Sequence, residues 1–294
     1  MIEQVNNEEA TGRGKAPAIA IFAYGRRGYA QAAENLALTL REHSPNVPVH
    51  LWAGEGLRVD HALFTKVHKL DASWYTEGPG TLKVNVYEIL PKGDWLYMDA
   101  DSLVIADIAP HLEALRQYDF AIEVKGKGGE HDVIYYTPWA TNATIKRVCE
   151  LKDDATYYGV QSSWIWIRKP SKKVAQIYKI ASQVQYQPSD LKEPWGNDIP
   201  DELRLASALS SVKIELPDYR MSFYGQGHEY KGLADVAKHL PIVCLYGDLR
   251  QHRLIKSTWF DAYDRYVRSL YKKHGRQMWY NLHSVMQDKY VNKK

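Results

Sequence analysis

Two aspartates one residue apart, Asp99 and Asp101, stand between two apolar runs, residues 95–98 and 103–105. The first run is short and begins after Gly93, which favours a buried strand over a helix and makes a solvated turn less favourable. In open α/β sheets, ligands bind outside the carboxyl ends of the strands. Paired carboxylates suit Mg²⁺ or Mn²⁺, and such a metal can hold a diphosphate. The pair therefore predicts a divalent-cation site at a sheet edge.

The elements that must position this pair can be inferred from the spacing of apolar residues. Residues 18–23 are typical of a buried strand, and residues 30–40 have helical spacing that stops at Ser44-Pro45. A second strand is predicted over 47–53, and a helix over 80–89 leads into the central strand. This β-loop-α-β opening predicts a parallel sheet with right-handed crossovers.

The rest of the chain continues the same mixture of strands and helices. Strands are predicted over 118–124, 162–168 and 241–246, and helices over 141–152, from the Ser171 cap onward, and over 200–210. The glycine-rich residues 125–131 predict a mobile loop, either a lid or a plain surface connection. From residue 257 onward we expect two amphipathic helices, broken near His274-Gly275.

Composition bounds the class of protein. With 294 residues, 45% hydrophobic and 25% charged, the chain is an ordinary globular protein, which excludes wholesale disorder. Two cysteines, Cys149 and Cys244, form no disulfide framework, so a cytoplasmic location is expected. Residues 1–15 are polar and no apolar run approaches about 18 residues, so we expect neither a signal peptide nor a transmembrane helix. We expect a flexible lead over 1–15, a main α/β domain over 16–256, and a helical extension over 257–294.

The extension is basic. Residues 250–294 carry 11 Lys and Arg against 3 Asp, although the whole chain has a net charge of only +3. Interleaved with these charges are the aromatic residues Trp259, Phe260, Tyr263, Tyr266, Tyr271, Trp279, Tyr280 and Tyr290. Three interpretations stay open: the aromatic rings pack on the main domain, the segment lies on an anionic membrane at its inner face, or it binds nucleic acid through phosphates and stacking.

The segment Leu96 to Ile105, with Leu82-Lys83 and Leu90-Pro91 upstream, resembles the GT-A glycosyltransferases. The similarity is greatest to family 8, the glycogenin and galactosyltransferase-like group, with its bacterial and phage relatives. It covers roughly residues 18 to 252, and its specific part is the Asp-x-Asp region. The resemblance implies a GT-A-type fold with a mostly parallel central sheet flanked by helices. It also implies transfer of a hexose from a nucleoside diphosphate sugar, most simply a UDP-sugar, to an acceptor hydroxyl, with retention of configuration.

The resemblance further implies roles for individual residues. Asp99 and Asp101 would hold Mn²⁺ or Mg²⁺, and Asp99 would also contact the nucleotide ribose. Ala23 and Tyr24, at the end of the first strand, match the nucleoside-binding edge of the family, and Lys83 matches a lysine near the donor. The loop that follows the first strand carries two cations, Arg26 and Arg27. Each either reaches the phosphates or serves solubility as an exposed charge.

The sugar side departs from the family's pattern. Gln161 takes the position of a family Asn that contacts the donor sugar, and Gln is one methylene longer. Asp198 or Asp201 falls where the family has Asp-Gln-Asp, near sugar and acceptor, but the Gln is absent here. The resemblance therefore implies catalytic roles for Gln161 and for Asp198 or Asp201, and the identity of the donor sugar stays open.

The third metal ligand also departs from the pattern. The family supplies a His just before a Gly near the end of the domain, whereas this chain has Cys244 and Tyr246 before Gly247. Neither a thiol nor a phenol is a typical ligand for a hard cation. Asp248 would substitute as the ligand, Gly247 would contact the donor, and Arg250, His252 or Arg253 would neutralise the phosphate directly.

Three other functions stay open on the sequence alone. One is a phage-type transferase acting on a DNA base, so the acceptor is a glycan, a lipid-linked sugar or a modified base. Another is a non-catalytic domain that binds a nucleotide sugar, since fold does not decide activity. The last is a haloacid dehalogenase-like phosphatase. That family has Thr or Val at the position of Leu103 and Asp at the position of His252, so this chain departs from its pattern at both.

Overall fold

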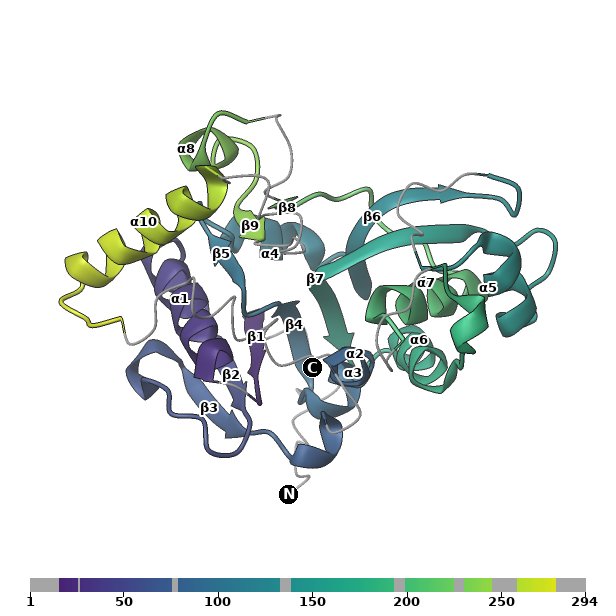
Figure 1. The fold of residues 1–294 in the computed structure, drawn as a ribbon, viewed down its shortest axis with the longest axis horizontal. Helices are drawn as coiled ribbons and strands as arrows, with labels where there is room; N and C mark the ends of the chain where they lie inside the picture. The colour runs from purple at the N-terminus through teal and green to yellow at the C-terminus, as the bar shows by residue number, and fades with distance from the viewer. Residues whose placement is uncertain are drawn as a thin grey trace, which may run out of the picture.

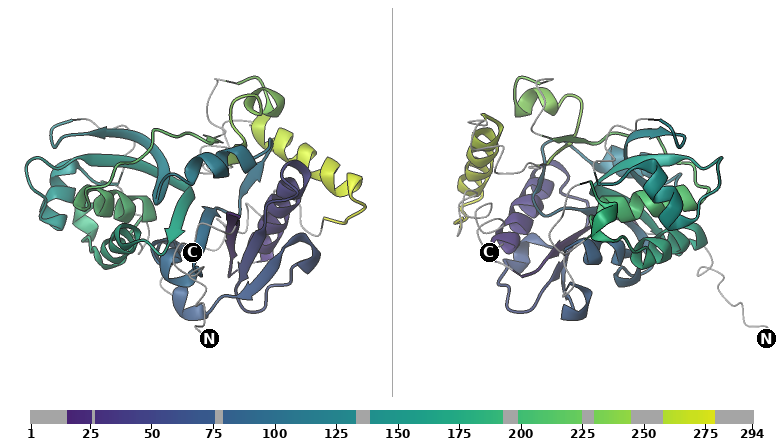
Figure 2. Two further views of the ribbon diagram at one scale, coloured as in Figure 1. Left: turned by 180° about the vertical axis from the view of Figure 1, so that it is seen from behind. Right: turned by 45° about the vertical axis from the view of Figure 1, so that its right-hand side comes forward.

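A computed structural model describes residues 16–25, 27–75, 79–132, 139–192, 199–224, 230–244 and 258–278. Over these ranges the chain forms a six-stranded sheet, a three-stranded sheet and helices on both faces of the larger sheet (Figure 1, Figure 2). Among the described residues, we find no helix with the length and apolar character needed to span a membrane.

The larger sheet has the order β3-β2-β1-β4-β7-β6. Its strands are β1 (Ala18–Ala23), β2 (Val49–Ala53), β3 (Lys66–Lys69), β4 (Gly93–Met98), β6 (Phe120–Gly128) and β7 (Tyr157–Lys169). Strands β1 to β4 are parallel, and β7 runs antiparallel to both β4 and β6. From β1 the chain builds outward to β2 and β3 on one side, then returns to β4 on the other side. The carboxyl ends of β1 and β4 therefore flank the point where the strand order reverses.

The smaller sheet has the order β5-β9-β8. It consists of β5 (Ser102–Val104), β8 (Ser222–Tyr224) and β9 (Ile242–Cys244). The backbone N–H of Ser102 donates to the carbonyl of Asp99 at 3.1 Å and closes a turn between β4 and β5. The two aspartates of the Asp-x-Asp pair therefore lie in the connection that leaves one sheet and enters the other.

The helices fall into two groups in the views of Figures 1 and 2. Helices α1 and α10 lie side by side near β2, while α5, α6 and α7 gather beside β6 and β7. The helices are α1 (Arg27–His43), α2 (Pro79–Val84), α3 (Val86–Ile89), α4 (Ala109–Leu115), α5 (Asn142–Cys149), α6 (Lys172–Gln183), α7 (Asp201–Ser211), α8 (Leu233–Val236) and α10 (Thr258–Lys273). Short 3-10 turns occur at His61–Leu63, Ala72–Trp74 and Pro188–Asp190.

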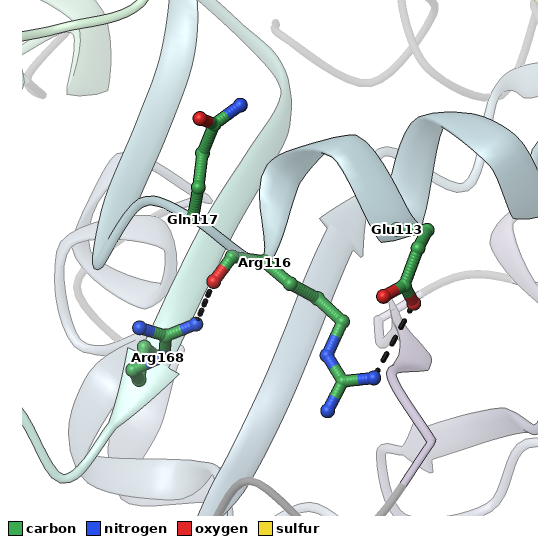
Figure 3. Close-up of a pocket in the computed structure, with 4 residues that line it drawn as sticks. All are labelled: Glu113, Arg116, Gln117 and Arg168. Atoms are coloured by element: carbon green, nitrogen blue, oxygen red, sulfur yellow. Dashed lines mark hydrogen bonds and ion pairs between the residues drawn. The ribbon is translucent and has the colours of Figure 1, made fainter.

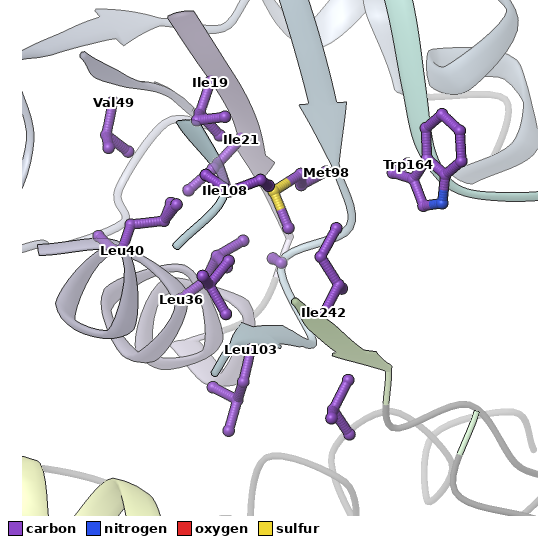
Figure 4. Close-up of a cluster of buried hydrophobic side chains, with 14 of the residues drawn as sticks. Ile19, Ile21, Leu36, Leu40, Val49, Met98, Leu103, Ile108, Trp164 and Ile242 are labelled. Atoms are coloured by element: carbon purple, nitrogen blue, oxygen red, sulfur yellow. The ribbon is translucent and has the colours of Figure 1, made fainter. Parts of the chain in front are cut away.

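Alternation along the strands separates two hydrophobic cores. Ile19 and Ile21 of β1 face one side of the sheet and pack with Leu36 and Leu40 of α1 and with Met98 of β4 (Figure 4). All five side chains are fully buried. Side chains of a strand point alternately to the two faces, so Ile19 and Ile21 share one face of the sheet. The same core also contains residues of the smaller sheet and of helix α10.

The opposite face forms the second core with α2, α3, α6 and α7. Aromatic rings cross this face from strand to strand. Phe22 stacks on Trp52 with 5.0 Å between ring centroids, and its ring centroid is 5.8 Å from that of Tyr97. This row of rings holds β2, β1 and β4 in register beneath the carboxyl edge of the sheet.

Helix α10 belongs to the α1 side of the molecule. Tyr263, Val267, Leu270 and Tyr271 are buried in the same core as α1. The amide of Gln31 in α1 donates to the Tyr271 hydroxyl at 2.7 Å. These tyrosine rings are thus packing residues, whereas the second helix expected in the extension falls beyond residue 278, outside the described residues.

The structure confirms the α/β class with a mostly parallel central sheet flanked by helices. The first strand has the predicted bounds, 18–23, and the helix after it ends just before Ser44. Ser171 caps α6, because its hydroxyl accepts from the N–H of Val174 at 3.4 Å. Helix α7 begins at Asp201, as the pattern after Pro200 predicts.

The expectation of a mobile loop over residues 125–131 was wrong for its first half. Strand β6 continues through Gly128, where it still pairs with Tyr157 of β7. A side chain at Gly128 would place its Cβ 2.6 Å from an oxygen of Asp132, so the close approach of the chain explains this glycine. Strands β3, β5 and β8 and helix α4 were not predicted, because segments of three to seven residues carry too little periodicity.

Candidate active site

A lysine ammonium group lies at the centre of a polar cluster beside the carboxyl end of β4. Lys83 Nζ lies 3.1 Å from Asp99 Oδ2, 3.1 Å from Asp201 Oδ2 and 3.0 Å from Ser162 Oγ. The contacts with Asp99 and Ser162 are hydrogen bonds, and the contact with Asp201 is an ion pair. The Ser162 hydroxyl in turn donates to Asp201 Oδ2 at 2.5 Å. The cluster joins α2, β4, β7 and α7.

Each carboxylate of the cluster is held by the element that carries it. The N–H of Asp99 donates to the carbonyl of Ser163 at 2.9 Å, and the Tyr97 hydroxyl donates to Asp99 Oδ1 at 2.7 Å. Asp201 is the first residue of α7, where the helix dipole favours a negative charge. Both carboxylates are therefore fixed before any ligand arrives.

Burial and charge shift the pKa values of the cluster. Burial opposes protonation of Lys83, but the carboxylates of Asp201 and Asp99 outweigh it and hold the lysine pKa well above its ordinary value. The pKa of Asp99 is raised, first by burial and also by the nearby charges of Asp101 and Asp201, while Lys83 opposes the rise. Three carboxyl groups, those of Asp99, Asp101 and Asp201, thus face the single ammonium group of Lys83. Such a site favours the binding of a further cation.

Glu202 follows Asp201 in the first turn of α7 and extends the acidic side of the cluster. Burial, and next the charge of Asp201, raise the pKa of Glu202 to about 8. Its Oε2 accepts a hydrogen bond from Trp139 Nε1 at 3.4 Å. The carboxyl group is thus held beside Asp201 by an indole ring.

Asp101 supplies the second carboxylate of the Asp-x-Asp pair and is half-buried. The described part of the chain contains no group of three or more His, Cys, Asp or Glu side chains arranged to hold a metal ion. Cys244 is no substitute, because burial raises the pKa of its thiol to about 12 and its sulfur lies 3.3 Å from the Ser102 hydroxyl. Asp99 and Asp101 have the oxygen ligands and the excess negative charge that a hard divalent cation requires.

The end of β1 lies close to the Lys83 cluster. Tyr24 stacks on Tyr75 with ring centroids 4.8 Å apart and on Tyr29 with ring centroids 6.2 Å apart. Burial is the main cause of the raised pKa of the Tyr24 hydroxyl, and the charges of Lys83 and Asp99 also act on it. A Cβ on the glycine at position 54 would lie 2.9 Å from Tyr24 Cβ, so the chain after β2 approaches closely here.

The predicted site residues divide into three sets. The structure brings Lys83, Asp99, Asp101, Asp201 and Tyr24 together, with Ala23 buried at the end of β1. Gln161 is fully buried, and its Oε1 has no hydrogen-bond partner among the described residues. Gln161 is next to Ser162 in the sequence, but its Oε1 makes no hydrogen bond to the Lys83 cluster. Other predicted residues lie outside the described ranges: Arg26, Asp198, Gly247, Asp248, Arg250, His252 and Arg253.

Three side chains of the site were not predicted from the sequence. Ser162 is next to the predicted Gln161, and Tyr97 precedes Asp99 by two residues, which places it on the same side of the strand. For Glu202 the sequence indicates only a favourable partner of the helix dipole. The spacing of Tyr97 and Asp99 was a usable signal, whereas the contact between Ser162 and Lys83 joins residues far apart in the sequence.

A pocket elsewhere on the molecule is lined by Glu113, Arg116, Gln117 and Arg168 (Figure 3). It lies near Asp94, at the amino end of β4 and thus opposite the edge that carries Asp99. Its arginines are paired: Arg168 Nε lies 3.1 Å from Asp94 Oδ1, and Arg116 Nη1 lies 3.3 Å from Glu113 Oε2. Arg116 Nε also lies 3.7 Å from Asp94 Oδ2, so these ion pairs join the end of α4 to β4, and β4 to β7, and have a structural role.

Comparison with known proteins gives distant likenesses in structure alone. No protein-family model and no curated protein sequence matches the chain. The bifunctional glycosyltransferase WbbM is 13% identical with a TM-score of 0.46 over 88% of this chain and 52% of its own, so this chain spans about half of it. The galactosyltransferase LgtC, solved with donor and acceptor sugar analogues, is 14% identical with a TM-score of 0.46 over 87% of this chain and 95% of its own. Mouse xyloside xylosyltransferase 1 is 11% identical with a TM-score of 0.49 over 80% and 99%.

These structural neighbours are glycosyltransferases, but the likeness is too distant to say what this chain binds or catalyses. Its function is therefore inferred from the chain's own residues and from the topology of its sheet.

Proposed function

We propose that this chain is a GT-A-type glycosyltransferase. It would transfer a hexose from a nucleoside diphosphate sugar, a UDP-sugar in the simplest case, to an acceptor hydroxyl with retention of configuration. The observation that carries the proposal is the position of Asp99, Asp101 and Lys83 at the carboxyl end of β4, beside the end of β1. Between β1 and β4 the strand order reverses, and in open α/β sheets ligands bind at such a switch point.

The chemistry of the cluster suits a diphosphate leaving group. When the anomeric C–O bond breaks, the diphosphate keeps the bonding electron pair and gathers negative charge. Asp99 and Asp101 would hold a divalent cation, which would supply positive charge to that diphosphate when bound. The excess of carboxylates over lysine is the feature of this site that fits such a cation.

The residues of the chain would act by holding and orienting the donor. Tyr24 offers a stacked aromatic surface at the end of β1 for the nucleoside. Lys83 keeps Asp99 and Asp201 in fixed positions and lowers the repulsion between them. The acceptor oxygen would bond to the anomeric carbon while its proton leaves to solvent or a carboxylate, so the products are the glycoside and the nucleoside diphosphate.

The basic extension enters the proposal as a packing element. Its buried aromatic rings, Tyr263 and Tyr271, pack in the core that contains α1, which removes them as stacking or membrane-inserting groups. Binding of a membrane or of nucleic acid by α10 would then depend mainly on its charges. We also propose a cytoplasmic location, in keeping with the cysteine content of the sequence.

The experiment that tests the function measures release of UDP from a panel of UDP-hexoses, with and without Mn²⁺. We expect slow hydrolysis of at least one donor in the presence of Mn²⁺ and its loss in a folded Asp101→Ala variant. Retained turnover in that variant would refute the site. Release of phosphate from p-nitrophenyl phosphate, without UDP release, would favour the phosphatase alternative. Donor binding without turnover would leave the non-catalytic domain.

A second experiment concerns the third ligand. If Asp248 replaces the family's His, Asp248→Ala should raise the Mn²⁺ concentration needed for half-maximal activity, because one ligand is lost. Arg250→Ala should weaken UDP binding and leave the metal requirement unchanged. An Asp248→Ala enzyme with the metal response of the wild type would discard the substitution.

A further inference from the structure

We propose that Trp139 and Glu202 form the subsite that binds the sugar ring of the acceptor. The acceptor would then present a neutral, hydroxyl-rich glycan end to the site and not a nucleic acid. The inference depends on the proposed transferase function, because it concerns the acceptor side of the same site.

The two side chains lie together beside the Lys83 cluster. Glu202 is adjacent to Asp201, whose carboxylate bonds Lys83 at 3.1 Å. Trp139 comes from the segment before α5, and its Nε1 donates to Glu202 Oε2 at 3.4 Å. The pair thus adjoins the side of the cluster formed by α7, whereas Tyr24 adjoins it from the β1 side.

Trp139 is held by packing and stays partly exposed. It packs against a small hydrophobic cluster that includes Tyr157 and Leu203, yet it remains half-buried. Glu202 is also half-buried. An indole ring fixed by a hydrophobic cluster keeps its orientation, so it can offer a flat surface to a ligand at a small cost in entropy.

The chemistry of this pair matches a saccharide. Sugar rings present C–H groups on one face, which pack on an aromatic surface, and hydroxyl groups at the rim, which donate to a carboxylate. The pair offers both within one hydrogen-bond length. A carboxyl group next to Asp201 also lies close to where an acceptor hydroxyl must approach the donor.

The charge of the surroundings disfavours a phosphate-bearing acceptor. Three aspartates, Asp99, Asp101 and Asp201, surround the single positive charge of Lys83. The Glu202 carboxyl, with its pKa raised to about 8, adds its charge only as pH rises to that value. Phosphates brought against this side would meet like charge, which lowers affinity for a polyanion. Helix α10, which carries the exposed cations Arg265 and Lys272, lies at the other end of the molecule from α7 (Figure 1, Figure 2).

The experiment compares acceptors in a UDP-release assay with the donor that the wild type hydrolyses. The neutral acceptors are maltose and lactose, and the anionic acceptor is a duplex that contains 5-hydroxymethylcytosine. The variants are Glu202→Ala, Glu202→Gln and Trp139→Phe, with the exposed Glu215→Ala as a control that removes the same charge elsewhere. Thermal unfolding checks that every variant is folded.

We expect a neutral saccharide to raise UDP release above hydrolysis. At pH 8.5, above the pKa of about 8 of its carboxyl, Glu202→Ala should raise the acceptor KM about 10- to 100-fold, the range expected when a hydrogen bond to a charged group is lost. The acceptor KM of Glu202→Ala should rise more than its donor KM, whereas Glu215→Ala should leave both values and the acceptor-free hydrolysis unchanged. Glu202→Gln should recover part of the loss because its carbonyl still accepts, and Trp139→Phe should raise the acceptor KM alone.

Two results would overturn the acceptor subsite while the transferase stands. One is release stimulated by the modified duplex and by neither saccharide. The other is an acceptor KM in Glu202→Ala equal to that of Glu215→Ala. Absence of donor hydrolysis in the wild type would instead count against the transferase itself, so the two failures are distinguishable.

Discussion

Replacing Lys83 with Met removes the charge at the centre of the cluster and keeps most of the side-chain volume. Removing one partner of a buried ion pair costs about 3–5 kcal/mol, since the other charge is left buried. The side chains of Lys83, Asp99 and Asp201 keep 15%, 25% and 20% of their exposure, so solvent screens part of that penalty. We therefore expect a loss of about 3 kcal/mol in the free energy of unfolding at pH 7.

The assay is urea denaturation of Lys83→Met beside Lys179→Met, an exposed lysine of α6. At about 2–4 °C per kcal/mol for a domain of this order, the same loss should lower the melting temperature by about 6–12 °C in thermal unfolding. The double variant Lys83→Met/Asp201→Asn should lose less than the sum of its single variants, because the residues contact each other. A Lys83→Met protein as stable as Lys179→Met would refute the reasoning.

The deficit of Lys83→Met should also depend on pH. The native pKa of Asp99 is already raised, and loss of the lysine would raise it further. A carboxyl pKa that is raised on folding adds stability below the unfolded value, and this stability is lost as pH rises through the native pKa. The deficit should therefore be small near pH 4 and complete at pH 7. A deficit that is equal at both values would contradict the ion-pair account.

The same contacts support three further predictions. Asp101→Ala should abolish transfer without lowering stability, and a simultaneous loss of stability would show that Asp101 supports the fold instead. The pKa of Glu202 is raised to about 8, so its contribution to stability is present below about pH 4.5 and is lost as pH rises through 8. Glu202→Gln should remove most of this decline in stability, which the free energies of unfolding at pH 5 and pH 8.5 would show. Leu270→Ala in α10 should lower the free energy of unfolding by about 3 kcal/mol, whereas Lys272→Ala, at an exposed position, should lower it by less than about 0.5 kcal/mol. Equal losses in the two variants would mean that α10 is not part of the core.

Local signals in the sequence were sufficient for the elements that frame the site. The apolar run 18–23, bounded by polar loops, predicts β1 with its observed bounds. Ser171 predicts the start of α6, because a serine before an apolar helical pattern accepts a backbone N–H. The run before Asp99 predicts β4, whose burial is explained by its lack of charged residues after Asp94.

The division into two sheets could not be predicted in the same way. Ser102–Val104 has three residues, and its partner Ile242–Cys244 is about 140 positions away in the sequence. Such a strand is stabilised by its pairing with a distant segment, which no local pattern reports. The Asp-x-Asp pair was therefore expected at the edge of one sheet, and it lies in the connection between two.

The cluster itself shows the same limit. Lys83 and Asp99 were each linked to the donor by resemblance, but their ion pair with Asp201 and the bridging role of Ser162 are tertiary facts. Four residues from four elements meet within about one hydrogen-bond length, and the sequence spacing between them carries no record of it. The excess of negative charge, which supports the metal proposal, became visible only with these contacts.

The most direct test of the proposed donor site is calorimetric titration of UDP into the protein with and without Mn²⁺. If Asp99 and Asp101 hold a cation that binds the diphosphate, Mn²⁺ should tighten UDP binding at least tenfold in the wild type, about 1.4 kcal/mol. The same titration of a folded Asp101→Ala protein should show no effect of Mn²⁺. Tight UDP binding that ignores both Mn²⁺ and the loss of Asp101, or no binding of UDP by the wild type, would contradict the account.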